Sequence, residues 1–87
     1  MSQFATAEFK KKLDDIHDFP TVYMFKFIVT EERKDEVQKL FPSSKLNYKP
    51  SSKGKYTSVT ASIMMQSSDH VIKVYQKAQT IEGIIAL

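Results

Sequence analysis

The part of this sequence best suited to binding a ligand is a short polar turn followed by alternating hydroxyl side chains. Backbone N–H groups in a Ser-Ser-x-Gly turn can form a concave anion site, and nearby lysine and tyrosine side chains add positive charge and a flat wall. The candidate ligand-binding residues are Ser51, Ser52, Lys53, Gly54, Tyr56, Ser58 and Lys26. The same residues also fit a plain β-hairpin, in which Gly54 supplies a positive φ and Tyr56 packs against a neighbouring strand. Both interpretations stay open on the sequence alone.

Positive charge is concentrated around this turn. The chain has a formal net charge of +3, and no acidic residue occurs between positions 37 and 68. The lysines in that interval are Lys39, Lys45, Lys49, Lys53 and Lys55. A field of this sign attracts phosphate or carboxylate groups. The alternative is a set of solvated lysines that keep a small protein in solution and blunt the edges of its sheet.

Residues for nucleophilic or metal chemistry are scarce. The 87 residues include no cysteine and only two glycines, too few for a phosphate-binding loop or a dinucleotide fingerprint. The two histidines, His17 and His70, lie in different predicted elements and lack the spacing of metal ligands. The sequence therefore predicts a protein that is not an enzyme and that uses neither a cofactor nor a metal.

The same turn matches only the beginning of the RNA-recognition signature. Lys53 and Gly54 are the residue types that begin that signature on the third strand of its fold. Its stacking positions would fall on Lys55 and Thr57, neither of which is aromatic. Both positions share a strand face with Val59, so we expect them to point toward the core. The sequence therefore disfavours nucleic-acid binding.

Length and hydropathy indicate one small domain away from membranes. The longest apolar stretch, Val22 to Val29, is far shorter than the roughly 20 residues that span a bilayer, and Lys26 interrupts it. No signal peptide is recognisable, and the lack of cysteine fits a reducing compartment. We expect a cytoplasmic protein without membrane association.

Four segments have the composition of β-strands. Thr21 to Val29 and Lys55 to Met65 are rich in β-branched and aromatic residues or alternate clearly between apolar and polar side chains. Weaker patterns at Lys45 to Lys49 and at Ile84 to Leu87 predict two shorter strands.

Three segments are predicted to be helical. Their expected bounds are Ala5 to Ile16, Thr30 to Pro42, and Ser67 or Ser68 to Gly83. We expect Thr30 to cap the second helix, which should have about three turns, and Gly83 to end the third helix in the left-handed region.

After the first helix, the element order β-α-β-β-α-β is the ferredoxin-like, or split-βαβ, plan. It predicts an α+β fold with a four-stranded antiparallel sheet in the spatial order 4-1-3-2. Right-handed crossovers place two helices on one face of that sheet. The expected division is an N-terminal helical extension over residues 1–18 and a single ferredoxin-like domain over residues 19–87.

The sheet face away from these helices is expected to carry Met24, Ile28 and Met64 beside small polar residues. An apolar patch of this kind often meets another protein or a second copy of the chain, so a homodimer is one open alternative. In the other alternative, the N-terminal helix covers this face with Phe9, Leu13 and Ile16.

Several segments of the chain occur together in one known family. They are Phe19-Pro20-Thr21, Lys26, Pro50-Ser51-Ser52-Lys53-Gly54-Lys55-Tyr56-Thr57-Ser58-Val59, Val74-Tyr75 and Ile85-Ala86-Leu87. In these segments the chain resembles the YbeD-like family of small bacterial proteins of unknown function, over roughly Leu13 to Leu87. Members often end their first strand with Lys-Val-x-Gly, whereas here the stretch Lys26-Phe27-Ile28-Val29-Thr30 keeps the lysine and lacks the glycine.

The resemblance implies a ferredoxin-like fold and a bacterial cytosolic protein. It also implies similarity to ACT-type regulatory domains, which bind amino acids or other small effectors, often between subunits. It brings no catalytic residues. The leading hypothesis is a regulatory or small-ligand-binding domain whose partner is an unidentified protein or a small anionic effector. The alternative is an interaction or assembly module that uses the open sheet face, followed by an RNA-binding module.

Overall fold

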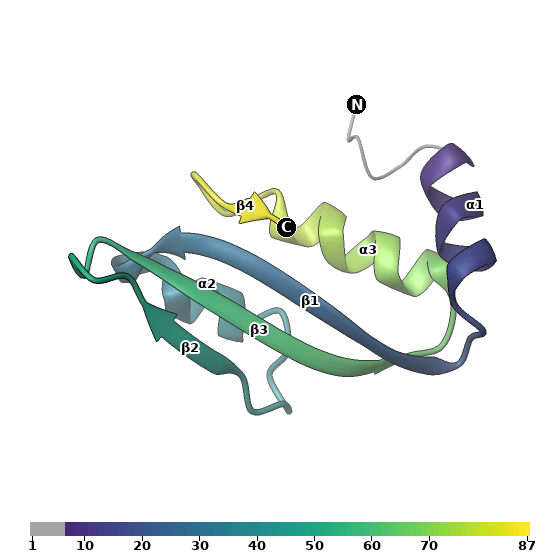
Figure 1. Ribbon diagram of the computed structural model, residues 1–87, viewed down its shortest axis with the longest axis horizontal. Helices are drawn as coiled ribbons and strands as arrows, with labels where there is room; N and C mark the ends of the chain where they lie inside the picture. The colour runs from purple at the N-terminus through teal and green to yellow at the C-terminus, as the bar shows by residue number, and fades with distance from the viewer. Residues whose placement is uncertain (1–6) are drawn as a thin grey trace.

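The structure is a computed structural model that describes residues 7–87. Two long strands run side by side across the molecule, and the helices gather on one side of them (Figure 1). The elements are α1 (Ala7–Ile16), β1 (Thr21–Thr30), the 3₁₀ turn η2 (Glu31–Arg33), α2 (Lys34–Gln38), β2 (Asn47–Pro50), β3 (Tyr56–Met65), α3 (Ser68–Ala78) and β4 (Ile85–Ala86).

The sheet has four strands in the order β2-β3-β1-β4, and every neighbouring pair is antiparallel. Strands β1 and β3 are central and pair without a break from Thr21↔Met65 to Thr30↔Tyr56. The α+β, ferredoxin-like arrangement and its strand order were predicted correctly. Because a strand alternates its side chains between two faces, this unbroken register fixes which residues meet the helices and which face outward.

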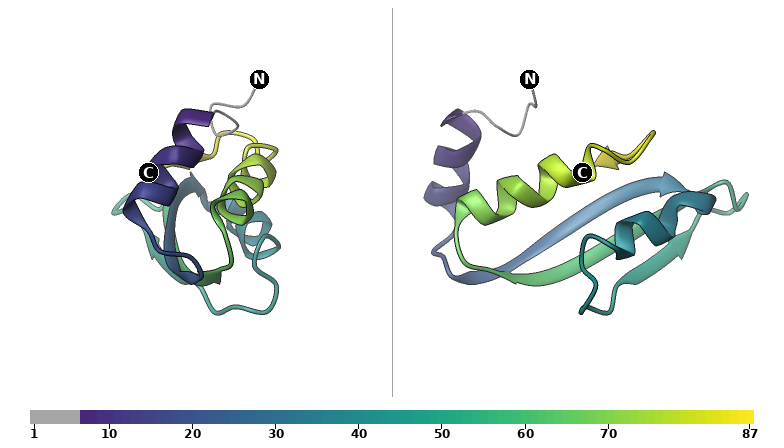
Figure 2. Two further views of the ribbon diagram at one scale, coloured as in Figure 1. Left: turned by 90° about the vertical axis from the view of Figure 1, so that its right-hand side faces the viewer. Right: turned by 180° about the vertical axis from the view of Figure 1, so that it is seen from behind.

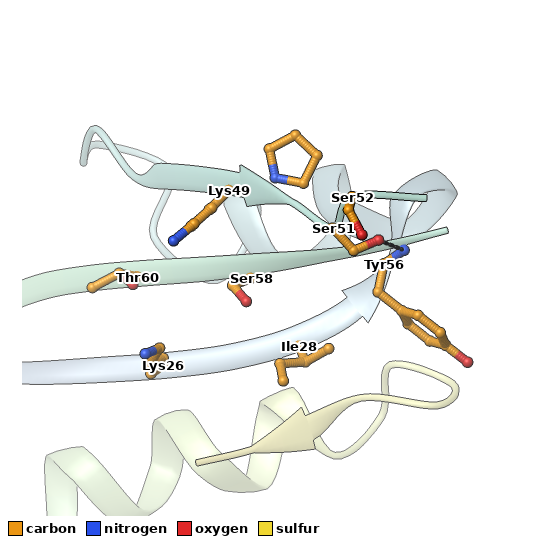
Figure 3. A pocket seen from close by; sticks show the side chains of 9 residues that line it. Lys26, Ile28, Lys49, Ser51, Ser52, Tyr56, Ser58 and Thr60 are labelled. Carbon is orange, nitrogen blue, oxygen red and sulfur yellow. Dashed lines mark hydrogen bonds between the residues drawn. The ribbon is translucent and has the colours of Figure 1, made fainter. Parts of the chain in front are cut away.

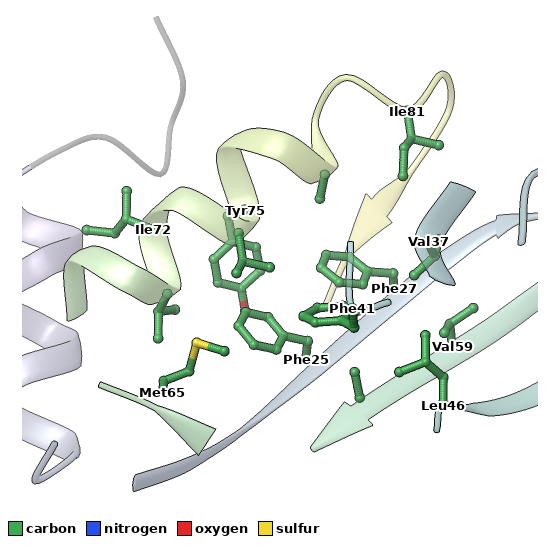
Figure 4. Packing of buried hydrophobic residues seen from close by; sticks show 14 of the residues in the cluster. Phe25, Phe27, Val37, Phe41, Leu46, Val59, Met65, Ile72, Tyr75 and Ile81 are labelled. Atoms are coloured by element: carbon green, nitrogen blue, oxygen red, sulfur yellow. The ribbon is translucent and has the colours of Figure 1, made fainter. Parts of the chain in front are cut away.

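The core lies between the central strands and α3 (Figure 4). Phe25, Phe27 and Val29 of β1 are fully buried, as the alternation of the strand predicts. Tyr75 of α3 places its ring 5.3 Å from that of Phe25, in an edge-on contact. The hydroxyl of Tyr75 lies 2.9 Å from that of Tyr23, so its polar end is satisfied inside an otherwise apolar layer.

Helix α1 lies across the N-terminal end of α3 (Figure 2). Leu13 is buried there, and the ring of Phe9 meets the ring of Tyr75 edge-on at 5.8 Å. Lys10 Nζ donates a hydrogen bond of 2.8 Å to Ser68 Oγ. The alternative in which this helix covers the open sheet face with Phe9, Leu13 and Ile16 is therefore wrong. Phe9 meets α3, Leu13 belongs to the buried core, and Ile16 is 74% exposed. The predicted start of this helix, Ala5, lies outside the described residues.

The second helix is shorter than predicted, and Thr30 does not cap it. The segment begins with η2 and continues as α2 for only five residues. The backbone N–H of Glu31 donates to Lys55 O, which extends the strand pairing one residue further and keeps Thr30 extended. The hydroxyl of Thr30 makes no capping bond, and its buried oxygen has no partner in the described structure.

Ser67 caps α3, as predicted, and its hydroxyl accepts from the N–H of His70. Three other boundaries differ from the predictions. The helix ends at Ala78, so Gly83, at φ +74°, shapes the following turn and does not end the helix. Strand β4 is shorter than predicted, and β2 begins and ends later, at Asn47–Pro50. Proline is tolerated in β2 because this strand lies at the edge of the sheet.

Candidate functional site

The register of the sheet brings a row of hydroxyl side chains to the open face. Ser58 and Thr60 lie on one face of β3, the face opposite to that of buried Thr57 and Val59. Lys26 of β1 pairs with Thr60, and Lys49 of β2 pairs with Ser58. The two lysines therefore lie on either side of the hydroxyl row (Figure 3).

These side chains line a shallow hollow of about 560 Å³ on the open face. The residues that line it are Lys26, Ile28, Lys49, Pro50, Ser51, Ser52, Tyr56, Ser58 and Thr60. The structure thus brings five of the seven predicted ligand-binding residues to one surface. Lys53 and Gly54 do not line the hollow; both are exposed in the turn at its rim.

The turn at the rim is held by its own hydrogen bonds. Ser51 N–H donates to Tyr56 O at 2.7 Å, and Gly54 N–H donates to Ser51 O at 2.9 Å. Tyr56 N–H donates to the hydroxyl of Ser51 at 3.2 Å. The N–H groups of Ser51 and Gly54 are therefore used within the hairpin, and of the predicted backbone cradle only those of Ser52 and Lys53 are left for an anion.

Gly54 has a conformational role in this turn. Its φ is +70°, and no atom lies within 4 Å of the position that a Cβ would occupy. A side chain would therefore meet no neighbour, but an L-residue disfavours this backbone region. This part of the structure agrees with the hairpin interpretation.

The hollow has a positive and a neutral half. The side chains of Lys26 and Lys49 are exposed, and none of the described residues that line the hollow is acidic. Ile28, Pro50 and Tyr56 contribute apolar surface to the same hollow, and Ile28 lies across Ser58 from Lys49. The arrangement can attract an anion.

Sequence reasoning missed Lys49 as a member of this site. The residue was noted only as one lysine of a basic segment. Its position depends on the pairing of β2 with β3, because only the Lys49↔Ser58 register turns it toward the hydroxyl row. A weakly patterned strand of four residues does not reveal that register on its own.

A second recess, of about 440 Å³, lies at the end of β1 and is lined by Thr30, Glu31, Glu32 and Lys55. The side chain of Glu31 accepts hydrogen bonds from Lys34 and from the buried hydroxyl of Thr57. These bonds, led by that from Lys34, hold the pKa of Glu31 below its ordinary value. A carboxylate already committed in this way is a structural group at the end of the central strands.

The predicted interaction residues divide into two environments. Met24 and Met64 are 64% and 53% exposed, whereas Ile28 is half-buried and belongs to the hollow. Val22 pairs directly with Met64 and is 56% exposed, so it joins the methionines in an apolar patch that the sequence did not single out.

Among residues 7–87, no three histidine, aspartate or glutamate side chains are grouped so that they could hold a metal ion. No described helix is long and apolar enough to cross a membrane. The cytoplasmic location stays a prediction from the sequence.

Comparison with known proteins places the chain in a family. A family model described as "Protein of unknown function (DUF493)" matches residues 14–87. The chain belongs to this family. A UPF0250 protein of Shewanella baltica is 34% identical over 80 residues, covering 84% of this chain and 91% of the relative. The UPF0250 protein of Shewanella oneidensis has the same identity and coverage.

The match extends over nearly the whole segment in which the chain resembles the YbeD-like proteins. The relatives are bacterial, and their names give no activity. No solved structure matches the chain. The family therefore gives no function, which has to be argued from the geometry of the open face.

Proposed function

We propose that this protein is a non-enzymatic regulatory domain that binds a small anionic ligand on its open sheet face and acts through a partner protein. One observation carries the proposal. Lys26 and Lys49 flank the hydroxyls of Ser58 and Thr60, and none of the described residues that line the hollow is a carboxylate. An anion between the two ammonium groups would relieve their mutual repulsion and accept hydrogen bonds from the hydroxyls.

The expected affinity is modest because both lysines are exposed. Contacts between exposed charges are worth roughly 0.2–1 kcal/mol each and are screened over about 10 Å at 0.1 M salt. If the two lysines and the two hydroxyls each contribute about 1 kcal/mol, the total is about 4 kcal/mol, so a bare anion should bind with a dissociation constant no lower than about 1 mM. Weak binding of this kind suits a reversible sensor whose physiological ligand has further contacts.

Isothermal titration of the 87-residue chain with inorganic phosphate tests the proposal. Lys26→Met and Lys49→Met should each weaken binding about two- to fivefold, since each removes one exposed charge contact. Lys73→Met is the matched control, because Lys73 is exposed on α3 and does not line the hollow. Equal losses in all three variants would mean that phosphate responds to net charge alone, and the proposal would fail.

A second candidate function is protein interaction through the open face. The apolar patch formed by Val22, Met24 and Met64 favours it, since each of the three side chains is more than half exposed. Sedimentation of the wild-type chain and of Met24→Lys distinguishes the partners. Association that disappears in the variant would support a homodimer through this patch, and a concentration-independent monomer would exclude one.

A further inference from the structure

The hollow has two unlike halves, and each recognises a different chemical group. Its positive half consists of Lys26 and Lys49 with the hydroxyl row between them. Its apolar half consists of Ile28, Pro50 and Tyr56. A ligand that used only one half would leave the other in contact with water.

The positive half has the dimensions of a single oxyanion site. Lys26 and Lys49 lie on the two strands that flank β3 and are offset by two residues along them, so their backbones are roughly 12 Å apart at the usual strand spacing and rise. Their long flexible stems allow both ammonium groups to approach one group placed above β3. Ser58 and Thr60 are then beneath that group and can donate to its oxygens.

The apolar half continues across the sheet to its edge. Ile28 pairs with Ile85 of β4, which is 51% exposed, so two branched aliphatic side chains lie side by side. Tyr56 is 40% exposed and lines the hollow, as does Pro50. These surfaces suit a flat hydrocarbon group.

We infer that the ligand is a small amphiphilic oxyanion, with a phosphate or carboxylate head between Lys26 and Lys49 and a flat apolar tail over Ile28 toward Tyr56. This inference rests on the proposed function and specifies its ligand class. Burial of roughly 60 Å² of apolar ligand surface, at about 25 cal/mol per Å², corresponds to about a tenfold gain in affinity over the head alone.

The test compares ligands that share a head and differ in the tail. ¹H–¹⁵N titrations give the dissociation constants of methyl phosphate and phenyl phosphate, with acetate and phenylacetate as the carboxylate pair. We expect the phenyl compound of at least one pair to bind about tenfold more tightly than its small counterpart. Whichever pair binds more tightly identifies the head as phosphate or carboxylate. Benzyl alcohol, which has the tail without the charge, should not bind measurably.

Two substitutions test whether the tighter binding of the phenyl compound comes from the apolar half of the hollow. Ile28→Ser should reduce the phenyl advantage to about threefold or less, since the tail then loses most of its apolar contact. Ile16→Ser is the matched control, because Ile16 is 74% exposed on α1 and does not line the hollow. Lys26→Met should weaken both members of a pair by the same factor and leave their ratio unchanged.

If Ile28→Ser does not fold, the position of the tail can be measured in the wild-type protein. Nuclear Overhauser contacts between the phenyl protons and the methyl groups of Ile28 should then be present. If the small anions bind and the phenyl group adds no affinity in either pair, the amphiphilic ligand is refuted while the anion site stands. If none of the anions binds saturably, the proposed function itself is refuted. Phenyl contacts at Ile16 and none at Ile28 would place the tail elsewhere and also refute the inference.

Discussion

The hydroxyl pair between β1 and α3 gives a prediction for Tyr75→Phe. The change keeps the ring in the core and removes the hydrogen bond of 2.9 Å to Tyr23. An intramolecular hydrogen bond contributes about 0.5–1.5 kcal/mol net, so the free energy of unfolding at neutral pH should fall by about 1 kcal/mol. The phenyl ring preserves the edge-on contacts with Phe25 and Phe27, so no cavity term adds to this loss.

The same pair makes the effect of the substitution depend on pH. Burial, followed by the bond with Tyr23, raises the pKa of Tyr75 far above its ordinary value. In the unfolded chain a tyrosine ionises near pH 10, so above about pH 10 the unfolded state loses a proton that the folded state keeps. Because the pKa is higher in the folded state than in the unfolded chain, the protonated hydroxyl contributes its full stabilisation below about pH 10, and this stabilisation decreases as pH rises above that value. The loss is about 1.4 kcal/mol per pH unit.

Wild type and Tyr75→Phe should therefore converge above pH 10. The wild type starts about 1 kcal/mol more stable, so the two curves should cross near pH 11, at the slope of about 1.4 kcal/mol per unit. Urea unfolding followed by circular dichroism at about pH 7, 9, 10 and 11 measures the difference. The lysines titrate in both proteins and cancel in that difference. A difference that stays constant across this range would refute the buried, protonated hydroxyl pair.

Three further substitutions test other parts of the structure. Leu13→Ala should lower the free energy of unfolding by about 2–3 kcal/mol, because Leu13 is buried where α1 meets α3; an unchanged urea midpoint would show that α1 is not docked. Gly54→Ala should lower the free energy of unfolding by about 1 kcal/mol, as measured by thermal unfolding, because an L-residue disfavours the φ of +70°. A gain in stability would contradict that backbone geometry. The pKa of Glu31 is lower in the folded state than in the unfolded chain, where it is about 4.3. The ionised carboxylate therefore stabilises the fold above that pH, and this stabilisation is lost as pH falls. Glu31→Gln should therefore be less stable than wild type at neutral pH and equally stable near pH 2. If the difference in free energy of unfolding is the same at both pH values, the Glu31 carboxylate does not form the bonds with Lys34 and Thr57.

The strands could be predicted from the sequence because two of them are long and clearly patterned. Alternation in Thr21 to Val29 assigned Phe25, Phe27 and Val29 to the core, and all three are fully buried. With two strong central strands and two helical segments, handedness and chain order leave few arrangements, and the order β2-β3-β1-β4 follows.

Other features depend on contacts that no local pattern contains. Thr30 has the residue type of a helix cap, but the bond from Glu31 N–H to Lys55 O keeps the chain in the sheet at that point. The spacing of apolar residues in α1 predicted that one face of this helix is buried, but not which element it packs against. The structure shows that this face packs against α3.

The candidate site was predictable in part for the same reason. Tyr56 and Ser58 follow the alternation of a long strand, so their face was predictable. Lys49 joins them only through the register of a short edge strand. The use of the Ser51 and Gly54 N–H groups within the hairpin was not predictable, because it depends on the geometry of the turn.

The most direct test of the anion site is a residue-resolved map of the amide shifts that inorganic phosphate causes in the wild-type ¹H–¹⁵N spectrum. The account predicts saturable shifts that share one dissociation constant at Lys26, Lys49, Ser58 and Thr60, with the amide of Lys73 unaffected. Shifts of similar size at all exposed lysines, growing linearly with phosphate, would contradict it and reduce the hollow to an ordinary basic surface.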